Sequence, residues 1–296
     1  MRQRQLSGSL RLAGIEVTTA ALMSWEDAVR WLLDQPDQAE LARSAYLDLP
    51  LADAARRYRQ SAEYAALRQL LPAVRGRVLD LGAGNGILSY ALAADGWQVT
   101  AVEPDPSALV GAGAIRSLAA ETGTAIEVVE AFGEAIPLAD AGYDLVIARQ
   151  ALHHAGDLAR FCKEMARLTR PGGLVVTLRD HVISGPEQMR AFLDAHPLHR
   201  LYGGENAFTI PQYADALAGA GLVVERTIGS LASVINYAPF TEADIRNAAI
   251  APFQALMRPV AAMLLRLVPL WLLQRLASAV DRRPGRLVSF VARRPA

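Results

Sequence analysis

Short apolar runs alternate with amphipathic stretches through the middle of the chain. Apolar runs of strand length occur at 78–81, 99–102, 126–129, 145–148 and 174–178. Between them, apolar residues recur at helical spacing at about 86–94, 107–120 and 157–169. Two later runs, 222–226 and 287–291, predict a sixth and a last strand. Strands that alternate with helices predict an α/β fold with a doubly wound, mostly parallel sheet.

The start of the chain departs from this alternation. Ser24 precedes two acids, Glu26 and Asp27, as in the first turn of a helix, and helical patterns follow at about 38–46 and 51–71. We therefore expect four parts, namely an N-terminal helical annex at 1–74, an α/β core at 75–237, a helical insert or lid at 238–286, and a final strand and tail at 287–296.

Composition limits what the chain can do. Of its 296 residues, 52% are apolar, which excludes a disordered or collagen-like chain and favours a large buried core. The formal net charge is zero, so no overall basic field indicates nucleic-acid binding. The charge is uneven, because residues 247–296 contain eight arginines and the single acid Asp281.

Cysteine content and apolar segments bear on where the protein works. Cys162 is the only cysteine, which rules out an intrachain disulfide and fits a cytoplasmic protein. Residues 1–24 lack the apolar stretch of a signal peptide, so no export is expected. The most apolar stretch, 248–273, is broken by arginines and prolines and predicts no spanning helix. Its composition leaves open peripheral contact with a membrane through residues 248–294.

The strongest local pattern is the segment 78–86, in which an apolar strand runs into glycines at every second position, 82, 84 and 86. Glycine permits sharp turns and close approach of a ligand. A dinucleotide fingerprint needs glycine at the position of Ile87, which disfavours NAD. Glu103 ends the next strand, where a carboxylate can accept hydrogen bonds from a ribose diol. Loop and acid together predict an adenosine-containing ligand.

In these residues the chain resembles the class I S-adenosylmethionine-dependent methyltransferases, particularly the small-molecule group that includes quinone-biosynthesis enzymes. The resemblance covers about 75–178. Its further matches are Glu134-Ala135-Ile136-Pro137, the strand at 143–147 followed by Leu152-His153-His154, and Leu168-Thr169-Arg170-Pro171-Gly172-Gly173. It implies a seven-stranded Rossmann-like sheet with an antiparallel last strand, and S-adenosyl-L-methionine as the cofactor of the core at 75–237.

The resemblance also implies how the cofactor is bound. The segment 80–86 would hold the methionine part and Glu103 the ribose. Where relatives carry an Asp two positions before Glu134, this chain has Phe132, so backbone groups near Phe132 and Gly133 and contact with the ring would recognise adenine. The expected cofactor-binding residues are Asp80, Gly82, Ala83, Gly84, Asn85, Gly86, Glu103, Pro104, Phe132, Gly133, Glu134 and Arg149.

All five histidines fall between positions 153 and 199. His153 and His154 follow the fourth strand and His181 follows the fifth, and segments that follow parallel strands line the ligand crevice. A neutral imidazole can take the acceptor's proton near pH 7, so these three are candidate catalytic bases. The alternative is that they cap a helix or pack beside the cofactor. No spacing of histidines and acids demands a metal, and none is expected.

The loop at 197–208 is dense in polar groups around two adjacent glycines. It lies between the fifth strand and a helix that begins near Pro211, and loops on this edge often carry function. We expect it to bind the methyl acceptor through His199, Arg200, Tyr202, Glu205 and Asn206. A solvated turn with a local salt bridge is the alternative.

Together with the resemblance, these patterns predict an S-adenosylmethionine-dependent methyltransferase that acts on oxygen or nitrogen of a small or amphipathic acceptor, lipid-like compounds and natural products included. The alternative is a non-catalytic protein of this fold that binds a partner or acts as a sensor through its apolar, basic C-terminal segment. Residues 259–273 are apolar nearly all round a helix and must be covered. The domain itself, a second copy in a homodimer, an acceptor under a lid or an anionic membrane could cover them.

Overall fold

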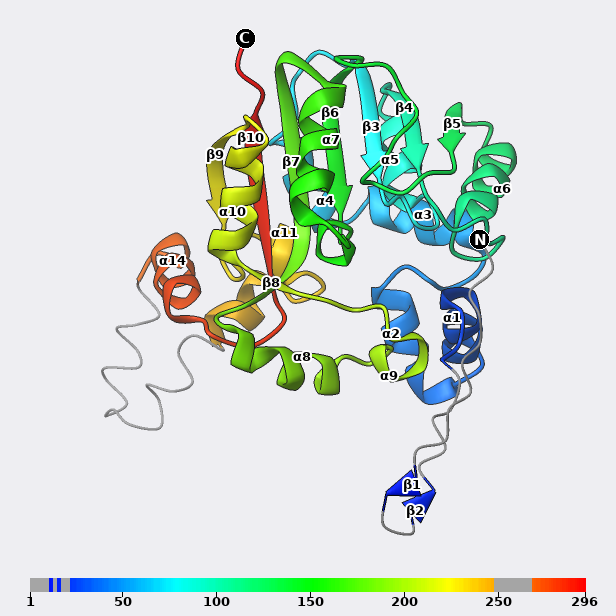
Figure 1. Cartoon of the computed structure of the whole chain (residues 1–296), viewed down its shortest axis with the longest axis vertical. Helices are drawn as coiled ribbons and strands as arrows, with labels where there is room; N and C mark the ends of the chain where they lie inside the picture. Colours follow the sequence, from blue (N-terminus) through cyan, green and yellow to red (C-terminus); the bar gives the residue numbers. More distant parts are fainter. Residues whose placement is uncertain (1–10, 13–14, 17–21, 248–267) are drawn as a thin grey trace.

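The computed structural model describes residues 11–12, 15–16, 22–247 and 268–296. Its centre is an eight-stranded sheet (Figure 1). The strands of this sheet are β3 (Arg77–Leu81), β4 (Gln98–Val102), β5 (Ile126–Val129), β6 (Tyr143–Arg149), β7 (Thr169–Ile183), β8 (Phe208–Thr209), β9 (Val223–Ile228) and β10 (Arg286–Arg293).

Seven of these strands lie in the order β5-β4-β3-β6-β7-β10-β9, and the short β8 pairs beside β7. Strands β3 to β7 pair in parallel, whereas β10 runs antiparallel to both β7 and β9. The predicted mostly parallel sheet with an antiparallel last strand is thereby confirmed. The order reverses between β3 and β6, and such a switch point opens a ligand crevice at the carboxyl ends of the strands.

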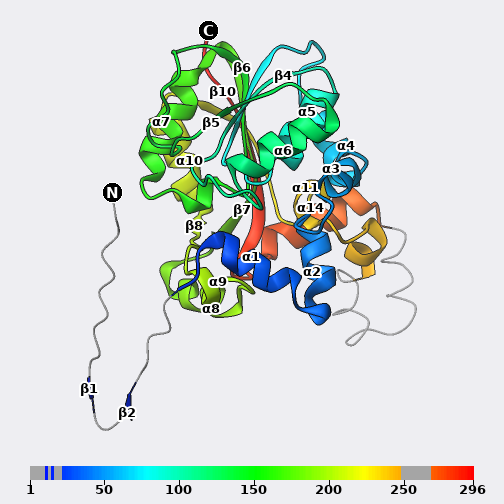
Figure 2. The same cartoon turned by 90° about the vertical axis from the view of Figure 1, so that its right-hand side faces the viewer.

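Helices cover both faces of the sheet because successive strand residues point to opposite sides. In β3, Val78 joins one buried cluster and Leu79 joins the other. Helices α5 (Ile87–Ala94) and α6 (Ala112–Thr122) contribute to the first cluster, and α7 (Leu158–Leu168) and α10 (Ile210–Gly219) contribute to the second. Figure 2 shows these two helical layers on either side of the strands.

The N-terminal part is helical from α1 onward, as predicted. Its elements are α1 (Trp25–Leu33), the short 3₁₀ turn η1 (Pro36–Gln38), α2 (Ala39–Ser44), α3 (Leu51–Arg59) and α4 (Ala62–Arg68). The Ser24 hydroxyl caps α1 by accepting a hydrogen bond from the Asp27 amide at 3.1 Å. The helix expected at 51–71 is two helices, because the Ser61 hydroxyl accepts from the Tyr64 amide and starts α4 anew. Before these helices, Arg11–Leu12 (β1) pairs with Ile15–Glu16 (β2).

Two predicted boundaries differ from the structure. Helix α6 begins at Ala112 and not near 107. The Ser107 hydroxyl accepts hydrogen bonds from the backbone amides of Leu109 and Val110, at 3.1 and 3.2 Å, and so holds a turn before the helix. Strand β7 continues to Ile183, since its end pairs with both β8 and β10. The prediction that His181 follows this strand was therefore wrong, because His181 lies within it.

The segment between β9 and β10 is described in part. It contains α11 (Val234–Tyr237), a helical stretch at 242–247 and α14 (Leu270–Val280), while residues 248–267 lie outside the described residues, together with most of the apolar segment singled out above. Helix α14 exposes Trp271, Leu276 and Val280. Among the residues that the structure describes, no helix combines the length and the apolar character needed to cross a membrane.

Candidate functional site

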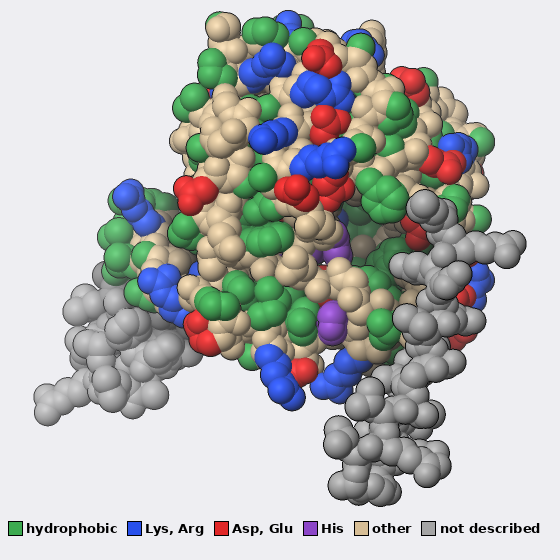
Figure 3. All heavy atoms as spheres, viewed as in Figure 1, with side chains coloured by type: hydrophobic (Ala, Val, Ile, Leu, Met, Phe, Trp, Pro, Cys, Tyr) green, Lys and Arg blue, Asp and Glu red, His purple; other side chains and the backbone are tan. Residues whose placement is uncertain are grey.

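A cavity of about 820 Å³ opens at the carboxyl ends of β3, β4, β6 and β7. Its walls include the loop after β3, the histidines after β6, and apolar side chains of the N-terminal part, namely Trp25, Leu32, Leu41 and Leu47. Figure 3 shows histidine side chains within and below a hollow on one face of the molecule. Among the residues that the structure describes, none from the insert at 238–286 lines this cavity, whereas residues of the N-terminal part do. Residues 248–267 of the insert lie outside the described residues, so its role as a lid stays a prediction.

The loop after β3 has a backbone that favours glycine at three positions. Gly82, Gly84 and Gly86 have φ values of +64°, +55° and +84°. A Cβ at Gly82 would also lie 2.5 Å from the Ala151 Cβ. The amides of Gly82 and Ala83 donate to the Val102 carbonyl at 2.9 and 3.1 Å, which ties the loop to β4. A ligand can therefore approach the backbone closely at this point.

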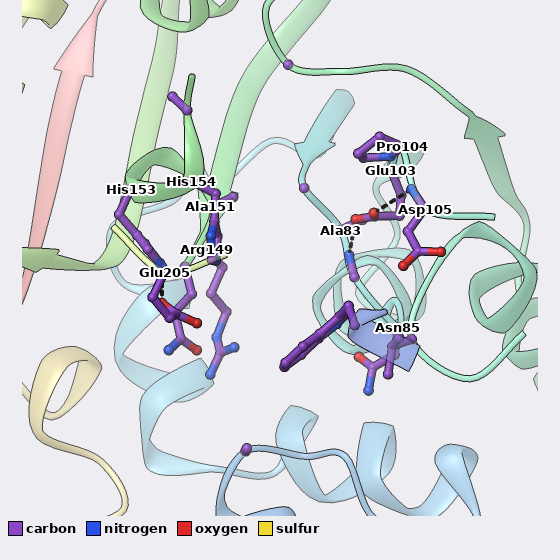
Figure 4. A pocket seen from close by; sticks show the side chains of 18 of the residues that line it. Ala83, Asn85, Glu103, Pro104, Asp105, Arg149, Ala151, His153, His154 and Glu205 are labelled. Atoms are coloured by element: carbon purple, nitrogen blue, oxygen red, sulfur yellow. Dashed lines mark hydrogen bonds and ion pairs between the residues drawn. The ribbon is translucent and has the colours of Figure 1, made fainter. Parts of the chain in front are cut away.

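Glu103 lies across from this loop, as predicted (Figure 4). Its Oε2 accepts a hydrogen bond from the Gly84 amide at 2.8 Å, and its Oε1 accepts one from the Asp105 amide at 3.0 Å. Burial raises the pKa of Glu103, and the two amides act against that rise. A carboxylate has about four acceptor sites. Two of them stay available to a ribose diol in the cavity.

Asp80 presents a second carboxylate to the same end of the cavity. Its Oδ2 accepts from the Ser89 hydroxyl at 2.6 Å, while Oδ1 is buried and has no hydrogen-bond partner. Burial raises the pKa of Asp80 to about 7. A buried acceptor without a donor is costly, so this oxygen suits the ammonium group of an amino-acid ligand. The glycine loop, Glu103 and Asp80 thus fit the ribose and methionine parts of S-adenosylmethionine.

The other predicted cofactor residues also line the cavity, and several have structural partners. Asn85 donates to the Tyr46 carbonyl at 2.8 Å and so joins the loop to the N-terminal part. Glu134 accepts from the Gly156 amide at 2.9 Å, just before α7. Pro104 follows Glu103 on the cavity wall. These contacts shape the cavity without using every group that faces it.

Phe132 and Gly133 form the part of the wall expected to meet adenine. The Phe132 side chain is 70% exposed and lines the cavity. A Cβ at Gly133 would lie 2.1 Å from the Phe161 ring, so only glycine, which has no side chain, fits at this position. An exposed ring beside a backbone without side chains suits stacking on a flat base.

Arg149 lines the cavity but is already paired. Its guanidinium donates to both carboxylate oxygens of Glu63 in α4, at 2.7 and 3.2 Å, and lies over the Tyr58 ring. Arg179 comes within 3.4 Å of the same carboxylate. Burial opposes ionisation of Glu63, but the two arginines outweigh it and lower its pKa. Sequence patterns did not indicate Glu63, because its partner is 86 residues away.

His153 follows β6 in the 3₁₀ turn η2 (Leu152–His154) and is fully buried. Its Nδ1 lies 3.1 Å from Asp180 Oδ1, and its Nε2 lies 3.6 Å from Glu205 Oε2. Burial would lower the pKa of His153, but these two carboxylates outweigh burial and raise the pKa to about 9. The raised pKa favours the charged form of His153 near pH 7, which disfavours it as the neutral base considered above.

His154 has the opposite character. Its Nδ1 donates to the Gly204 carbonyl at 2.9 Å, and its side chain is exposed to the cavity. Desolvation of the ring by the surrounding walls and the charge of His153 lower the pKa of His154 to about 4. Because a carbonyl only accepts, Nδ1 carries the proton and Nε2 is a free acceptor.

His181 and His196 stand on the same side of the cavity. Nδ1 of His181 donates to the Gly285 carbonyl at 2.8 Å, and burial with the nearby charge of His153 lowers the pKa of His181 to about 3. His196 follows α8 (Met189–Ala195), and burial lowers its pKa as well. The described structure therefore brings four of the five histidines to one wall of the cavity. This histidine wall consists of His153, His154, His181 and His196.

The loop at 197–208 is divided. Tyr202 and Glu205 line the cavity, and the Tyr202 hydroxyl donates to the Glu205 carboxylate. His199, Arg200 and Asn206 are not part of the lining. They sit in or beside the single turn of α9 (His199–Tyr202), where Arg200 donates to the Asp194 carbonyl and Asn206 accepts from the Ala207 amide. The sequence patterns missed Asp180 and His196, which have no motif around them.

Comparison with known proteins finds a family model that matches the centre of the chain. Residues 79–177 match the model of a methyltransferase domain. An uncharacterized methyltransferase from Mycobacterium tuberculosis is 44% identical over 119 residues, which are 39% of this chain and 45% of the relative. A ubiquinone biosynthesis O-methyltransferase from Methylobacterium is 29% identical over 160 residues, 51% of this chain and 61% of that protein. The matches thus span about half the length of these relatives.

The fold is shared with solved structures. The crystal structure of an S-adenosylmethionine-dependent methyltransferase from Mesorhizobium loti superimposes with a TM-score of 0.53 at 22% identity. The likeness covers 79% of this chain and 98% of that one. The family match and the geometry of the glycine loop agree on the same segment. Residues 79–177 therefore match a methyltransferase domain, and the chain has the fold of that S-adenosylmethionine-dependent methyltransferase.

Proposed function

We propose that the protein transfers the methyl group of S-adenosylmethionine to an oxygen or nitrogen atom of a small or amphipathic acceptor. The observation that carries the proposal is a single cavity with a site suited to a nucleoside at one side and the histidine wall at the other (Figure 4). Glu103 and the glycine loop supply the first side, and His154 belongs to the second. A transfer reaction needs two ligands in one space with their reacting atoms aligned.

The chain's own groups would divide the work as follows. S-adenosylmethionine, when bound, supplies a methyl group already activated on a sulfonium. Asp80 and Glu103 would hold its ammonium and ribose groups, and Phe132 would cover the base. His154 Nε2, free because Nδ1 donates to the Gly204 carbonyl, would accept the proton that an acceptor hydroxyl or amine loses.

The acceptor is expected to be partly apolar. Trp25, Leu32, Leu41 and Leu47 of the N-terminal part face the cavity, while Tyr202 and Glu205 supply polar groups. Mostly apolar walls with a few polar groups are typical of sites that orient small molecules. This mixture favours an amphipathic compound, lipid-like or a natural product, over an ion or a nucleic acid.

The alternative function is a non-catalytic protein of the same fold that binds a partner through its C-terminal segment. The exposed Trp271, Leu276 and Val280 of α14 are the described residues that favour it. The two functions differ in one measurable respect. An enzyme transfers label from methyl-labelled S-adenosylmethionine to a product, whereas a binding protein leaves the cofactor intact.

Calorimetry tests the cofactor site first. S-adenosylhomocysteine should bind and NAD should not. Glu103→Ala removes charge-assisted hydrogen bonds of about 1.5–3 kcal/mol, so binding should weaken about 10- to 150-fold. Glu130→Ala, which removes the exposed ion pair with Arg116, is the matched control and should leave binding unchanged. Equal effects of the two substitutions, or preferential NAD binding, would contradict the proposal.

The acceptor is then sought directly. The pure protein is incubated with methyl-labelled cofactor and cell extract, and mass spectrometry identifies labelled products. A labelled amphipathic compound supports the proposed function and names the acceptor. A protein that binds the cofactor but labels nothing above the level of Glu103→Ala supports the non-catalytic alternative.

A further inference from the structure

Three side chains on the histidine wall bring ligand atoms together although they are far apart in the chain. His181 lies in β7, His196 follows α8, and Glu205 follows α9, and their ligand atoms lie within 4.8 Å of one another. We propose that these three residues bind one divalent first-row transition metal ion. The proposal does not depend on the methyl-transfer function, because it concerns binding of the ion alone.

The ring of His181 is held as in metal sites. Nδ1 of His181 donates to the Gly285 carbonyl at 2.8 Å, so Nε2 carries the free lone pair. Ligand histidines usually fix their second nitrogen by donating to a carbonyl in this way. His196 presents Nε2 to Glu205 Oε1 at 3.6 Å, which is too long for a hydrogen bond. Its buried Nδ1 has no hydrogen-bond partner.

Glu205 supplies the negative charge. Its side chain is only 6% exposed, and its Oε2 is buried without a hydrogen-bond partner. The other oxygen, Oε1, accepts from the Tyr202 hydroxyl, and ligand carboxylates are commonly held by such a contact. The nearest basic groups are imidazole nitrogens of His153 and His196, each at 3.6 Å. At 3.6 Å neither nitrogen makes a hydrogen bond to the carboxylate, so a metal ion would give it the close contact that these groups do not.

A second group of three, His153, His154 and Glu205, also brings its donors within 4.8 Å. It is the poorer site because carboxylates face both ring nitrogens of His153, Asp180 at Nδ1 and Glu205 at Nε2. Two flanking carboxylates favour a proton on each nitrogen. Within the described residues, neither His181 nor His196 has a carboxylate at Nδ1.

The donor set selects the class of metal. Two imidazoles and one carboxylate suit zinc, cobalt, iron, nickel or copper, whereas calcium and magnesium prefer oxygen ligands alone. Metal–ligand bonds of about 2.0–2.2 Å place the donor atoms of one metal roughly 3–4 Å apart. The donor atoms here lie within 4.8 Å of one another, so the side chains would move together by about 1 Å on binding. The Phe192 ring packs against both histidine rings and gives the site an apolar wall. Its centroid lies 5.0 Å from that of His181 and 5.8 Å from that of His196.

The test is titration of the full chain, freed of any polyhistidine tag and of metal, with Co²⁺ as the probe. The wild type should bind one Co²⁺ per chain with visible absorption bands. His196→Ala and Glu205→Gln should each weaken binding about 100-fold or more. His199→Ala and His154→Ala are the matched controls, because His199 lies outside both groups and His154 belongs only to the second.

Several outcomes would overturn the proposal. They are the absence of stoichiometric Co²⁺ binding by the wild type, an equal loss in His199→Ala, and a loss in His154→Ala that His196→Ala does not show. Thermal unfolding of each variant checks that the fold is intact. Should His196→Ala unfold, His196→Asn keeps more of the side-chain volume and the same loss of Co²⁺ binding is expected from it.

Discussion

Replacing Glu63 by Gln should destabilise the protein strongly although no apolar contact is lost. Glu63 is 2% exposed in α4, and its carboxylate meets Arg149 at 2.7 Å and Arg179 at 3.4 Å. The two arginine side chains are themselves only 12% and 10% exposed. Glutamine has nearly the same shape but no charge, so the change leaves two buried cations without their shared anion.

The magnitude follows from this burial. Removing one partner of a buried ion pair costs about 3–5 kcal/mol, because the remaining charge is desolvated without compensation. Carbonyl groups limit the loss, since Arg179 also donates to the carbonyls of Ile235 and Ala238 at 2.7 and 3.0 Å. We therefore expect a loss near the lower end, about 3 kcal/mol. At about 2–4 °C per kcal/mol for larger domains, the unfolding midpoint should fall by roughly 6–12 °C.

Urea and thermal unfolding of wild type and variant measure this loss. The matched control is Glu26→Gln, which removes the exposed pair with Arg30 and should cost about 0.5 kcal/mol or less. A Glu63→Gln variant as stable as the control would refute the reasoning. It would mean that water or another group compensates Arg149 and Arg179.

Other predictions concern chemistry, pH and the C-terminal segment. His154→Ala should lower turnover about 100-fold while S-adenosylhomocysteine affinity stays nearly constant. The control His199→Ala should leave both turnover and affinity unchanged. Unchanged turnover in His154→Ala would mean that His154 has a structural role. Because burial raises the pKa of Asp80 to about 7, the contribution of Asp80 to the stability of the ligand-free protein should fall as pH rises from about 4 to 7. Asp80→Asn should therefore gain stability relative to the wild type over this range in urea unfolding but weaken cofactor binding, and a stability difference between the two that does not change with pH would contradict the expectation. A membrane role for residues 248–294 predicts salt-sensitive co-sedimentation with anionic but not neutral vesicles, and a monomer in light scattering would exclude the homodimer.

Local features of the chain were determined by the sequence itself. The strand at 126–129 and the helix after Gly86 are where the apolar pattern predicts them. The glycine loop and Glu103 face each other because both follow neighbouring parallel strands. The turn at Gly82 depends on the residue itself, because glycine readily adopts a positive φ. The meeting of the loop and Glu103 depends on the general rule that parallel strands end on one edge of a sheet.

The histidine wall was decided by the tertiary structure. His153 depends on Asp180, 27 residues away, and Arg149 depends on Glu63, 86 residues away. His181 faces the cavity only because β7 extends along β10, which comes from the far end of the chain. Hydrophobic periodicity reports which face of an element is buried, not which polar group it meets there. Contacts between distant polar side chains are selected by packing of the whole domain, so the sequence patterns alone did not reveal the group formed by His181, His196 and Glu205.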